Sequence, residues 1–300
     1  MIKMKKSTLL FLSVVSAFYL SSCGSPAKTD DTEGAEAPKT EEPKSDAVSE
    51  TFFQVPSPGE MLTFIKMVGG QNNKNTSFLN PPSNQKTYAD AKSKGLNFGI
   101  YSCDLSYCSI FEIGSEALKY FKVVKIMGDQ IGVSTAIKPE TLKRIEANIS
   151  MPDSLAVITD DVYFSSFEAL EDSKQGPTLA LVVAGGWLES IFIAVNLAKY
   201  EPNSPIVERL ADQKYTLENL IEYLKKHEAD PGVGGVKADF ESLLAQYNTI
   251  KEQEAKGAVK TKNANEKTLE GGTELVMTKE VYNSIVEKIK TIRNSYTLTK

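Results

Sequence analysis

Two acidic residues stand inside otherwise apolar segments of this 300-residue chain and are its main candidates for chemistry. Asp104 lies within residues 99–107, and Glu189 lies within residues 184–192. Each segment carries small residues about one turn before the acid and an aromatic residue three positions after it. The likeness suggests an internal duplication, although a match this short also arises by chance. Because a buried carboxylate must be paired, hydrogen-bonded or neutral, the pattern predicts a definite role for both acids.

That role has two interpretations. In the first, both carboxylates bond to Tyr, Ser or Lys side chains of neighbouring helices and fix the packing. In the second, they line a ligand pocket with Tyr101, Tyr107 and Trp187, which offer aromatic faces and hydrogen-bond donors. Two carboxylates could also hydrolyse a glycoside by acid–base chemistry. That reaction requires a fixed separation between them, which the sequence does not supply.

The histidine content excludes most other catalytic arrangements. His227 is the single histidine and ends an amphipathic segment, so we expect a solvated side chain whose positive charge favours a helix C-terminus. A Ser-His-Asp or Cys-His set would have to use this residue. The sequence contains no phosphate-binding loop, dinucleotide fingerprint or calcium loop. We therefore predict no metal, no cofactor and, in the preferred interpretation, no catalytic residue.

Cys103 and Cys108 lie five residues apart in an apolar segment that is predicted to be helical. On a helix they would be separated by about 140° around the axis and about 7.5 Å along it. That spacing exceeds the reach of a disulfide without backbone movement. We favour two buried free thiols over a disulfide, and without histidine partners the two cysteines do not form a zinc site.

The first 23 residues have the pattern of a bacterial lipoprotein signal. Three lysines precede an apolar run over residues 9–20, and Leu-Ser-Ser-Cys follows with Cys23 at the exit. This arrangement is typical of a secretory signal peptide, and the apolar run is shorter than the roughly 20 residues of a spanning helix. Residues 1–22 are predicted to be removed and Cys23 to be lipidated. The alternative is ordinary secretion, with Cys23 a chance residue.

Residues 23–50 are predicted to form a disordered, acidic tether behind the lipid. Positions 24–50 hold eight acids and three lysines and almost no large apolar side chain, so they cannot bury enough surface to offset their ordering entropy. By resemblance to other lipoproteins, Gly24 in place of Asp favours delivery to the outer membrane. Residues 28–31 resemble the acidic patch of surface-exported lipoproteins, although a solvated linker explains them equally well.

The charge of the chain argues against a nucleic-acid partner. The formal net charge is −5, and only three arginines occur, at positions 144, 209 and 293. Nucleic-acid binding depends on clustered basic side chains that neutralise phosphates. We therefore expect contacts with a membrane, through the N-terminal lipid, and with an envelope protein.

Residues 51–300 are predicted to form a single all-α globular domain, a bundle or array of roughly ten helices joined by short loops. Apolar residues recur at helical spacing in segments that begin near positions 57, 85, 96, 118, 139, 153, 178, 217, 236 and 278. Ser57 and Thr278 are the predicted caps of the first and last of these helices. The segments from 85 and 96 are expected to be separate helices, over 85–94 and 96–111.

Two parts of this pattern leave a choice of structure. Residues 178–198 are long enough to span a membrane, but Glu189, Asn196 and two glycines favour a buried core helix. A polar stretch before the last helix is expected to hold a short β-hairpin near residues 268–277. Its strands would be 268–270 and 274–277, on either side of two glycines.

Three short segments carry a family resemblance: Val55-Pro56-Ser57-Pro58, residues 96–101 with Asp104-Leu105, and residues 184–190. In these segments the chain resembles an uncharacterised family of Bacteroidota-type outer-membrane lipoproteins. The likeness covers most of residues 52–200 and, more weakly, the C-terminal helix. It implies the helical fold and the location, and it supplies no catalytic residues.

These features together predict a lipid-anchored cell-envelope protein with a non-enzymatic binding or scaffold role. Its location would be the outer membrane, facing either the periplasm or the medium. The alternative is an envelope-glycan hydrolase or a small-ligand-binding protein that uses Asp104 and Glu189.

Overall fold

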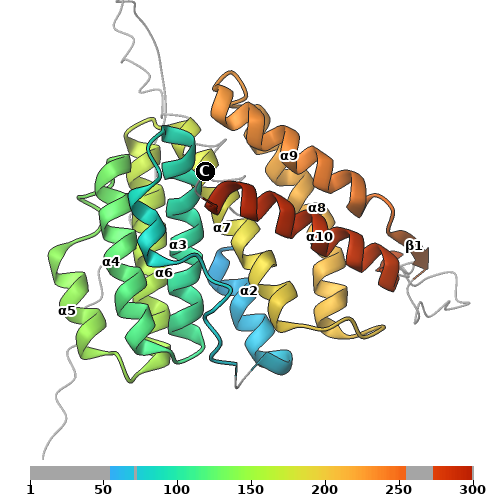
Figure 1. Cartoon of the computed structure of the whole chain (residues 1–300), viewed down its shortest axis with the longest axis horizontal. Helices are drawn as coiled ribbons and strands as arrows, with labels where there is room; N and C mark the ends of the chain where they lie inside the picture. Colours follow the sequence, from blue (N-terminus) through green and yellow to red (C-terminus); the bar gives the residue numbers. More distant parts are fainter. Residues whose placement is uncertain (1–54, 71–72, 255–272, 299–300) are drawn as a thin grey trace, which may run out of the picture. The chain divides into compact units, whose positions relative to one another are not determined.

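The computed structural model describes residues 55–70, 73–254 and 273–298. Over these residues the chain forms nine α-helices and one two-stranded antiparallel hairpin (Figure 1), which confirms the predicted all-α class with a short hairpin. The predicted signal peptide, the lipidation site Cys23 and the tether over 23–50 lie outside the described residues.

The described helices and strands follow one another along the chain. They are α2 (Pro58–Ile65), the π-helical turn η1 (Lys66–Gly70), the 3-10 helix η2 (Pro82–Lys86), α3 (Ala91–Ile110), α4 (Gly114–Ile131), α5 (Pro139–Ala147), α6 (Pro152–Asp172), α7 (Gly176–Leu197), α8 (Pro205–Lys225), α9 (Pro231–Tyr247), β1 (Lys251–Glu254), β2 (Thr273–Val276) and α10 (Lys279–Thr297).

The first and last of these helices begin at the predicted caps. The Ser57 hydroxyl accepts a hydrogen bond from the Glu60 N–H at 3.3 Å, and the Thr278 hydroxyl accepts one from the Val281 N–H at 3.4 Å. A side-chain acceptor at this position pairs an N–H that the helix itself leaves unpaired. The local sequence therefore determines where α2 and α10 begin.

The prediction of two helices over 85–94 and 96–111 is wrong. One helix, α3, covers this region from Ala91, and a separate 3-10 helix precedes it. Asp90 has an extended backbone, and its carboxylate accepts a hydrogen bond from the Ser93 N–H at 2.9 Å. The Asp90 cap therefore starts α3 inside the first expected helix, and α3 continues through the break that we expected near residue 95.

The hairpin contains the expected second strand but a different first strand. β2 pairs antiparallel with β1, so that Lys251 lies opposite Val276 and Glu254 lies opposite Thr273. The expected strand over 268–270 lies outside the described residues. β1 is polar and exposed along its whole length, so it lacks the alternation of apolar and polar residues by which a strand is identified in a sequence.

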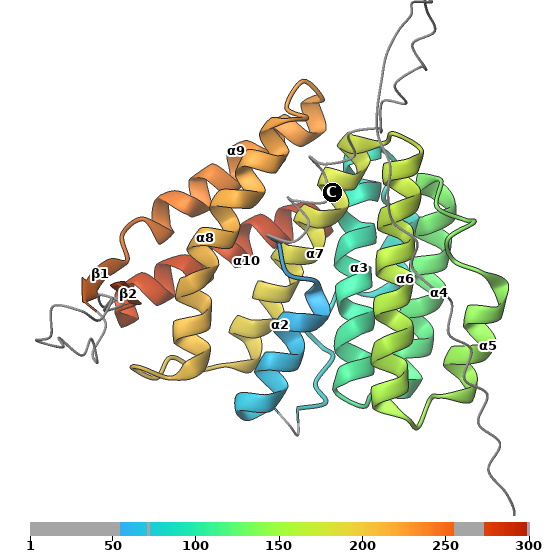
Figure 2. The same cartoon turned by 180° about the vertical axis from the view of Figure 1, so that it is seen from behind.

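Helix α7 is the core helix around which most of the other helices pack. It contacts α2, α3, α6, α8, α9 and α10 and lies between the α3–α6 group and the α8–α10 group (Figures 1 and 2). Among the described residues it is the one helix that is long and apolar enough to cross a membrane, and 94% of its apolar window is buried within the protein. This burial agrees with the predicted core helix.

Helices α3 and α7 approach each other closely because glycines lie at their contact. A Cβ atom on Gly99 of α3 would overlap the carbonyl oxygen of Val182, and one on Gly185 of α7 would overlap the carbonyl oxygen of Leu96. Only glycine fits either position, because any side chain would force the two backbones apart. This contact brings together the two helices that carry Asp104 and Glu189.

Candidate functional site

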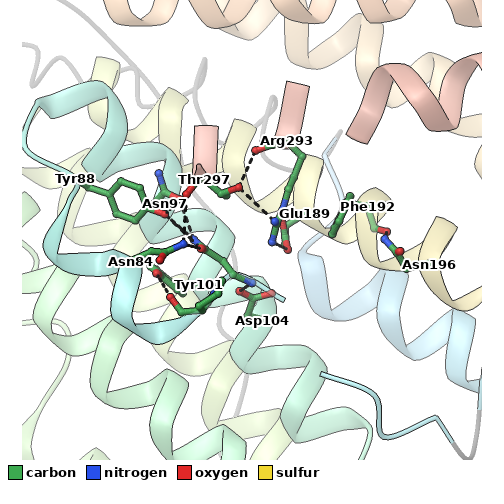
Figure 3. A network of polar contacts seen from close by, with 12 residues as sticks. Asn84, Tyr88, Asn97, Tyr101, Asp104, Glu189, Phe192, Asn196, Arg293 and Thr297 are labelled. Atoms are coloured by element: carbon green, nitrogen blue, oxygen red, sulfur yellow. Dashed lines mark hydrogen bonds and ion pairs between the residues drawn. The ribbon is translucent and has the colours of Figure 1, made fainter. Parts of the chain in front are cut away.

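The two acids meet in one buried polar cluster at the contact between α3 and α7 (Figure 3). Asp104 comes from α3 and Glu189 from α7, and both side chains are 0% exposed. The cluster also receives Arg293 from the last turns of α10, and this residue is 5% exposed. Three helices far apart in the sequence therefore contribute one charged side chain each.

Glu189 is fully paired by Arg293. The guanidinium donates from Nε to Glu189 Oε2 at 2.9 Å and from Nη2 to Glu189 Oε1 at 2.8 Å, which is the strong two-pronged geometry of such pairs. The same guanidinium lies over the Phe192 ring, 4.4 Å from its centre. Burial opposes the positive charge, but Glu189 more than offsets it, so the pKa of Arg293 is held above its usual value.

Asp104 has a much poorer set of partners than Glu189. Its Oδ2 accepts a hydrogen bond from the Asn80 N–H at 3.2 Å, while its Oδ1 has no hydrogen-bond partner among the described residues. Burial, together with the neighbouring charge of Glu189, raises the pKa of Asp104 well above its usual range, and Arg293 offsets only part of this effect.

The charges of the cluster balance only if one carboxyl group is neutral. Two carboxylates and one guanidinium leave one uncompensated negative charge in a buried site, which is costly. A proton on Asp104 removes that charge and turns the unpaired oxygen into a donor toward Glu189. The geometry therefore favours a neutral Asp104 beside an ionised Glu189 and Arg293.

A layer of polar side chains extends the cluster to the C-terminal end of α10 (Figure 3). Asn97 donates to the Tyr296 carbonyl oxygen at 3.0 Å, and the Tyr88 hydroxyl donates to the Thr297 carbonyl oxygen at 3.1 Å. These two oxygens belong to the last turn of a helix, where carbonyl groups lack intrahelical partners. The layer therefore attaches the end of α10 to α3 and to the segment before it.

The three aromatic residues of the predicted pocket each donate a hydrogen bond to a different partner. Tyr101 lies near Asp104 but donates its hydroxyl to the Pro81 carbonyl oxygen at 2.9 Å. Tyr107 donates to the Asn75 carbonyl oxygen at 3.0 Å, and Trp187 donates to the Gln213 side chain at 3.1 Å.

Two hollows are lined by described residues, one beside β2 and one between α5 and α6, and neither includes any of the five predicted pocket residues. The structure thus brings Asp104, Glu189 and Tyr101 together and directs the other two aromatic residues elsewhere.

The acids have different partners from the Tyr, Ser or Lys side chains that the packing interpretation named. Sequence reasoning missed Arg293 and Asn80, although one signal for Arg293 was present. Arg293 lies four residues after Ile289 and continues the apolar stripe of the last helix, and an arginine on such a stripe indicates a buried partner. Asn80 acts through its backbone N–H, which leaves no signal in the sequence.

The remaining reactive side chains also have defined environments. Cys103 and Cys108 are buried free thiols, as predicted, and burial raises the pKa of each, which makes them poor nucleophiles. His227 is half-buried against the Tyr223 ring, and burial together with Lys226 lowers its pKa. The histidine is therefore less solvated than expected, and its surroundings disfavour the positive charge.

In the described part of the chain, no group of three or more His, Cys, Asp or Glu side chains is placed to hold a metal ion. The chain matches no protein-family model, no curated protein and no solved structure. Inference about function therefore rests on the residues themselves, above all on the buried cluster and on the N-terminal sequence.

Proposed function

We propose that this chain is a lipid-anchored protein of the cell envelope whose helical body acts by binding a partner. The observation that carries the proposal is the N-terminal pattern: a basic start, a short apolar run and Leu-Ser-Ser-Cys ending at Cys23. Acyl chains on this cysteine would hold the protein at a membrane, since two or more chains anchor stably. Gly24 and the lipoprotein resemblance favour the outer membrane.

The surroundings of the two acids favour binding over catalysis. A hydrolase that used Asp104 and Glu189 would have to admit a sugar between them, yet both are 0% exposed, and Glu189 already has both of its oxygens bonded to Arg293. An acid and a base in glycoside hydrolysis must reach the scissile bond. The cluster instead supports a structural role, in which the acids hold α3, α7 and α10 together.

The anchor is tested by expressing the tagged full chain in a Gram-negative host that is fed an alkyne fatty acid. We expect Cys23 to be the labelled N-terminal residue by mass spectrometry and the protein to fractionate with the outer membrane. The Cys23→Ala variant should lose the label, whereas Cys108→Ala, a control at a buried thiol, should keep it. An unlabelled wild-type protein would contradict the anchor.

The binding role is tested by cross-linking in intact cells, with the Cys23→Ala variant as the control. We expect one envelope protein to be captured reproducibly by the anchored chain and to be lost with the anchor. Turnover of an envelope glycan that is abolished by Asp104→Asn or Glu189→Gln, in variants that remain folded, would instead establish the hydrolase alternative.

A further inference from the structure

A hollow of about 620 Å³ lies beside the hairpin, well away from the acid cluster. One wall is the turn between α7 and α8 with the first turns of α8, and the other is β2 with the two residues that follow it. Its size is within the range of about 300–1,000 Å³ that is typical of ligand sites. It is lined by Tyr200, Pro202, Asn203, Val207, Glu208, Asp212, Thr273, Glu274, Leu275, Val276, Met277 and Thr278.

The hollow meets β2 along the edge of the strand. Side chains of successive strand residues point to opposite faces, so one face of a strand can present only every second residue. All six consecutive residues from Thr273 to Thr278 line this hollow, while no residue of β1 does. The hollow therefore runs along the edge of β2 that faces away from β1.

This outer edge of β2 has no hydrogen-bonded strand among the described residues, although α8 packs against β2. The sheet has two strands, and the backbone of 273–276 makes no hydrogen bond outside its ladder with β1 among the described residues. An exposed edge of this kind is a template for a further strand, because its N–H and C=O groups have no partners in the sheet. Four residues give about 13 Å of edge.

The charged residues in the described lining of the hollow are all acidic. They are Glu208, Asp212 and Glu274, and none of the three forms an ion pair among the described residues. Burial raises the pKa of Asp212, and Arg209 opposes this shift. A cationic partner would neutralise these carboxylates, which form no ion pair with a described residue.

We propose that this groove binds an extended, basic segment of a partner protein, which adds to the outer edge of β2 as a third strand. Backbone hydrogen bonds to β2 would supply affinity, and the three carboxylates would select lysine or arginine side chains of the added strand. The inference rests on the proposed binding function and names the class of partner. A second copy of the same chain is a poor occupant, because it would bring Glu274 against the same acidic lining.

The test uses the detergent-solubilised full chain and labelled hexapeptides, with binding followed by fluorescence anisotropy. The probe alternates arginine with valine, and a peptide that alternates glutamate with valine is the charge control. A third peptide keeps the arginines but carries N-methyl groups along one edge, which removes the donors needed for strand pairing. We expect the basic probe to bind at least about tenfold more tightly than either control peptide.

Protein variants locate the site. Glu208→Gln combined with Asp212→Asn should weaken binding of the basic probe about fivefold or more. Glu252→Gln combined with Glu254→Gln is the matched control, because it removes two negative charges from β1 of the same hairpin, outside the hollow. Bound peptide should also slow hydrogen exchange of the amides at 273–276.

Several results would overturn the proposal. The basic and acidic probes could bind equally well, or the N-methylated peptide could bind as well as the basic probe. The double variant could bind the basic probe as tightly as the wild type does. The chain could also form a dimer that dissociates when the peptide is added. Equal binding of the N-methylated peptide would show attraction by charge without strand addition. If the peptide does not bind, a positive lipid-labelling result still stands. If the lipid labelling fails, peptide binding can still be measured, so the two experiments test the two proposals separately.

Discussion

Asp104 and Glu189 occupy similar positions in two similar segments, yet the protein treats them in opposite ways. Each follows glycines at the contact of α3 with α7, and each is completely buried. Glu189 has both carboxylate oxygens bonded to Arg293, while Asp104 has one backbone donor and one unpaired oxygen. Similar settings in the sequence thus give a fully paired acid in α7 and, in α3, an acid whose pKa is raised by burial.

The difference shows what decides the state of a buried acid. Neither helix supplies the deciding group, because Arg293 comes from α10, 104 residues beyond Glu189 in the chain. One guanidinium fully pairs one carboxylate, so the second acid in the cluster must hold a proton or bear an uncompensated charge. The C-terminal helix therefore sets the charge of both sites.

The largest expected effect follows removal of the shared cation. Arg293→Met leaves Glu189 buried without a partner, so the free energy of unfolding should fall by about 3–5 kcal/mol. Urea denaturation of the purified chain measures this change. Adding Glu189→Gln to the variant should recover part of the loss, because no buried charge then remains unpaired. A loss below about 1 kcal/mol would show that the pair behaves like an exposed ion pair.

Replacing each acid with its amide should change the free energy of unfolding differently at the two positions. Glu189→Gln replaces a charge-assisted pair and should cost about 1.5–3 kcal/mol at neutral pH. Asp104→Asn preserves the acceptor for Asn80 and keeps a donor toward Glu189, so it should not destabilise the protein at pH 7. Urea denaturation at pH 7 compares them. Equal losses would contradict the asymmetry between the two sites.

Local sequence was sufficient to predict much of this arrangement. The apolar pattern predicted α7 as a core helix, and the acids within apolar segments were correctly expected to be buried, because both properties depend on residues close together in the chain. The pairing was not predictable in this way. Arg293 is joined to Glu189 only through the packing of α10, and Asn80 contributes a backbone group that any residue could supply.

Sequence reasoning also failed for features that depend on an exposed strand or on residues far away in the chain. β1 carries no apolar alternation, so nothing local identified it as the strand that pairs with β2. Tyr107 and Trp187 were grouped with the acids by proximity in sequence. Trp187 lies two residues before Glu189 and so points to another side of α7, where it bonds to Gln213. Tyr107 shares a helix face with Asp104, but its hydroxyl bonds to Asn75.

Substituting the contact glycine should lower stability by a similar amount on α3 and on α7, whereas the two acids should respond differently to substitution. Gly99→Ala and Gly185→Ala each place a methyl group against the opposing backbone, so each should destabilise the protein by about 1–3 kcal/mol. Gly235→Ala in α9 is the control, since its Cβ meets only the mobile end of Lys92, and it should be neutral or stabilising by up to about 1 kcal/mol. Thermal unfolding compares the three, and a tolerated Gly99→Ala would contradict the close contact.

The two acids should also differ in how the free energy of unfolding depends on pH. One titrating proton changes this free energy by at most about 1.4 kcal/mol per pH unit. The pKa of Asp104 is raised in the folded state, mainly by burial and then by Glu189. The folded protein therefore keeps a proton that the unfolded chain loses near pH 4, an ordinary value of about 3.9 for Asp. This contribution to stability is complete below that pH and is lost as pH rises through the raised pKa.

Asp104→Asn removes this titration, so the stability of the wild type relative to the variant should decline as pH rises above about 4. Asp160 is a useful comparator, because burial, with Glu60 and Asp161, raises its pKa to about 6. The decline due to Asp160 should end near pH 6, and the pH at which the decline due to Asp104 ends reports the folded-state pKa of Asp104. Urea denaturation of wild type, Asp104→Asn and Asp160→Asn across this range separates the two. Parallel curves for wild type and Asp104→Asn would mean that Asp104 holds no extra proton, and the charge balance of the cluster would then have to come from another group.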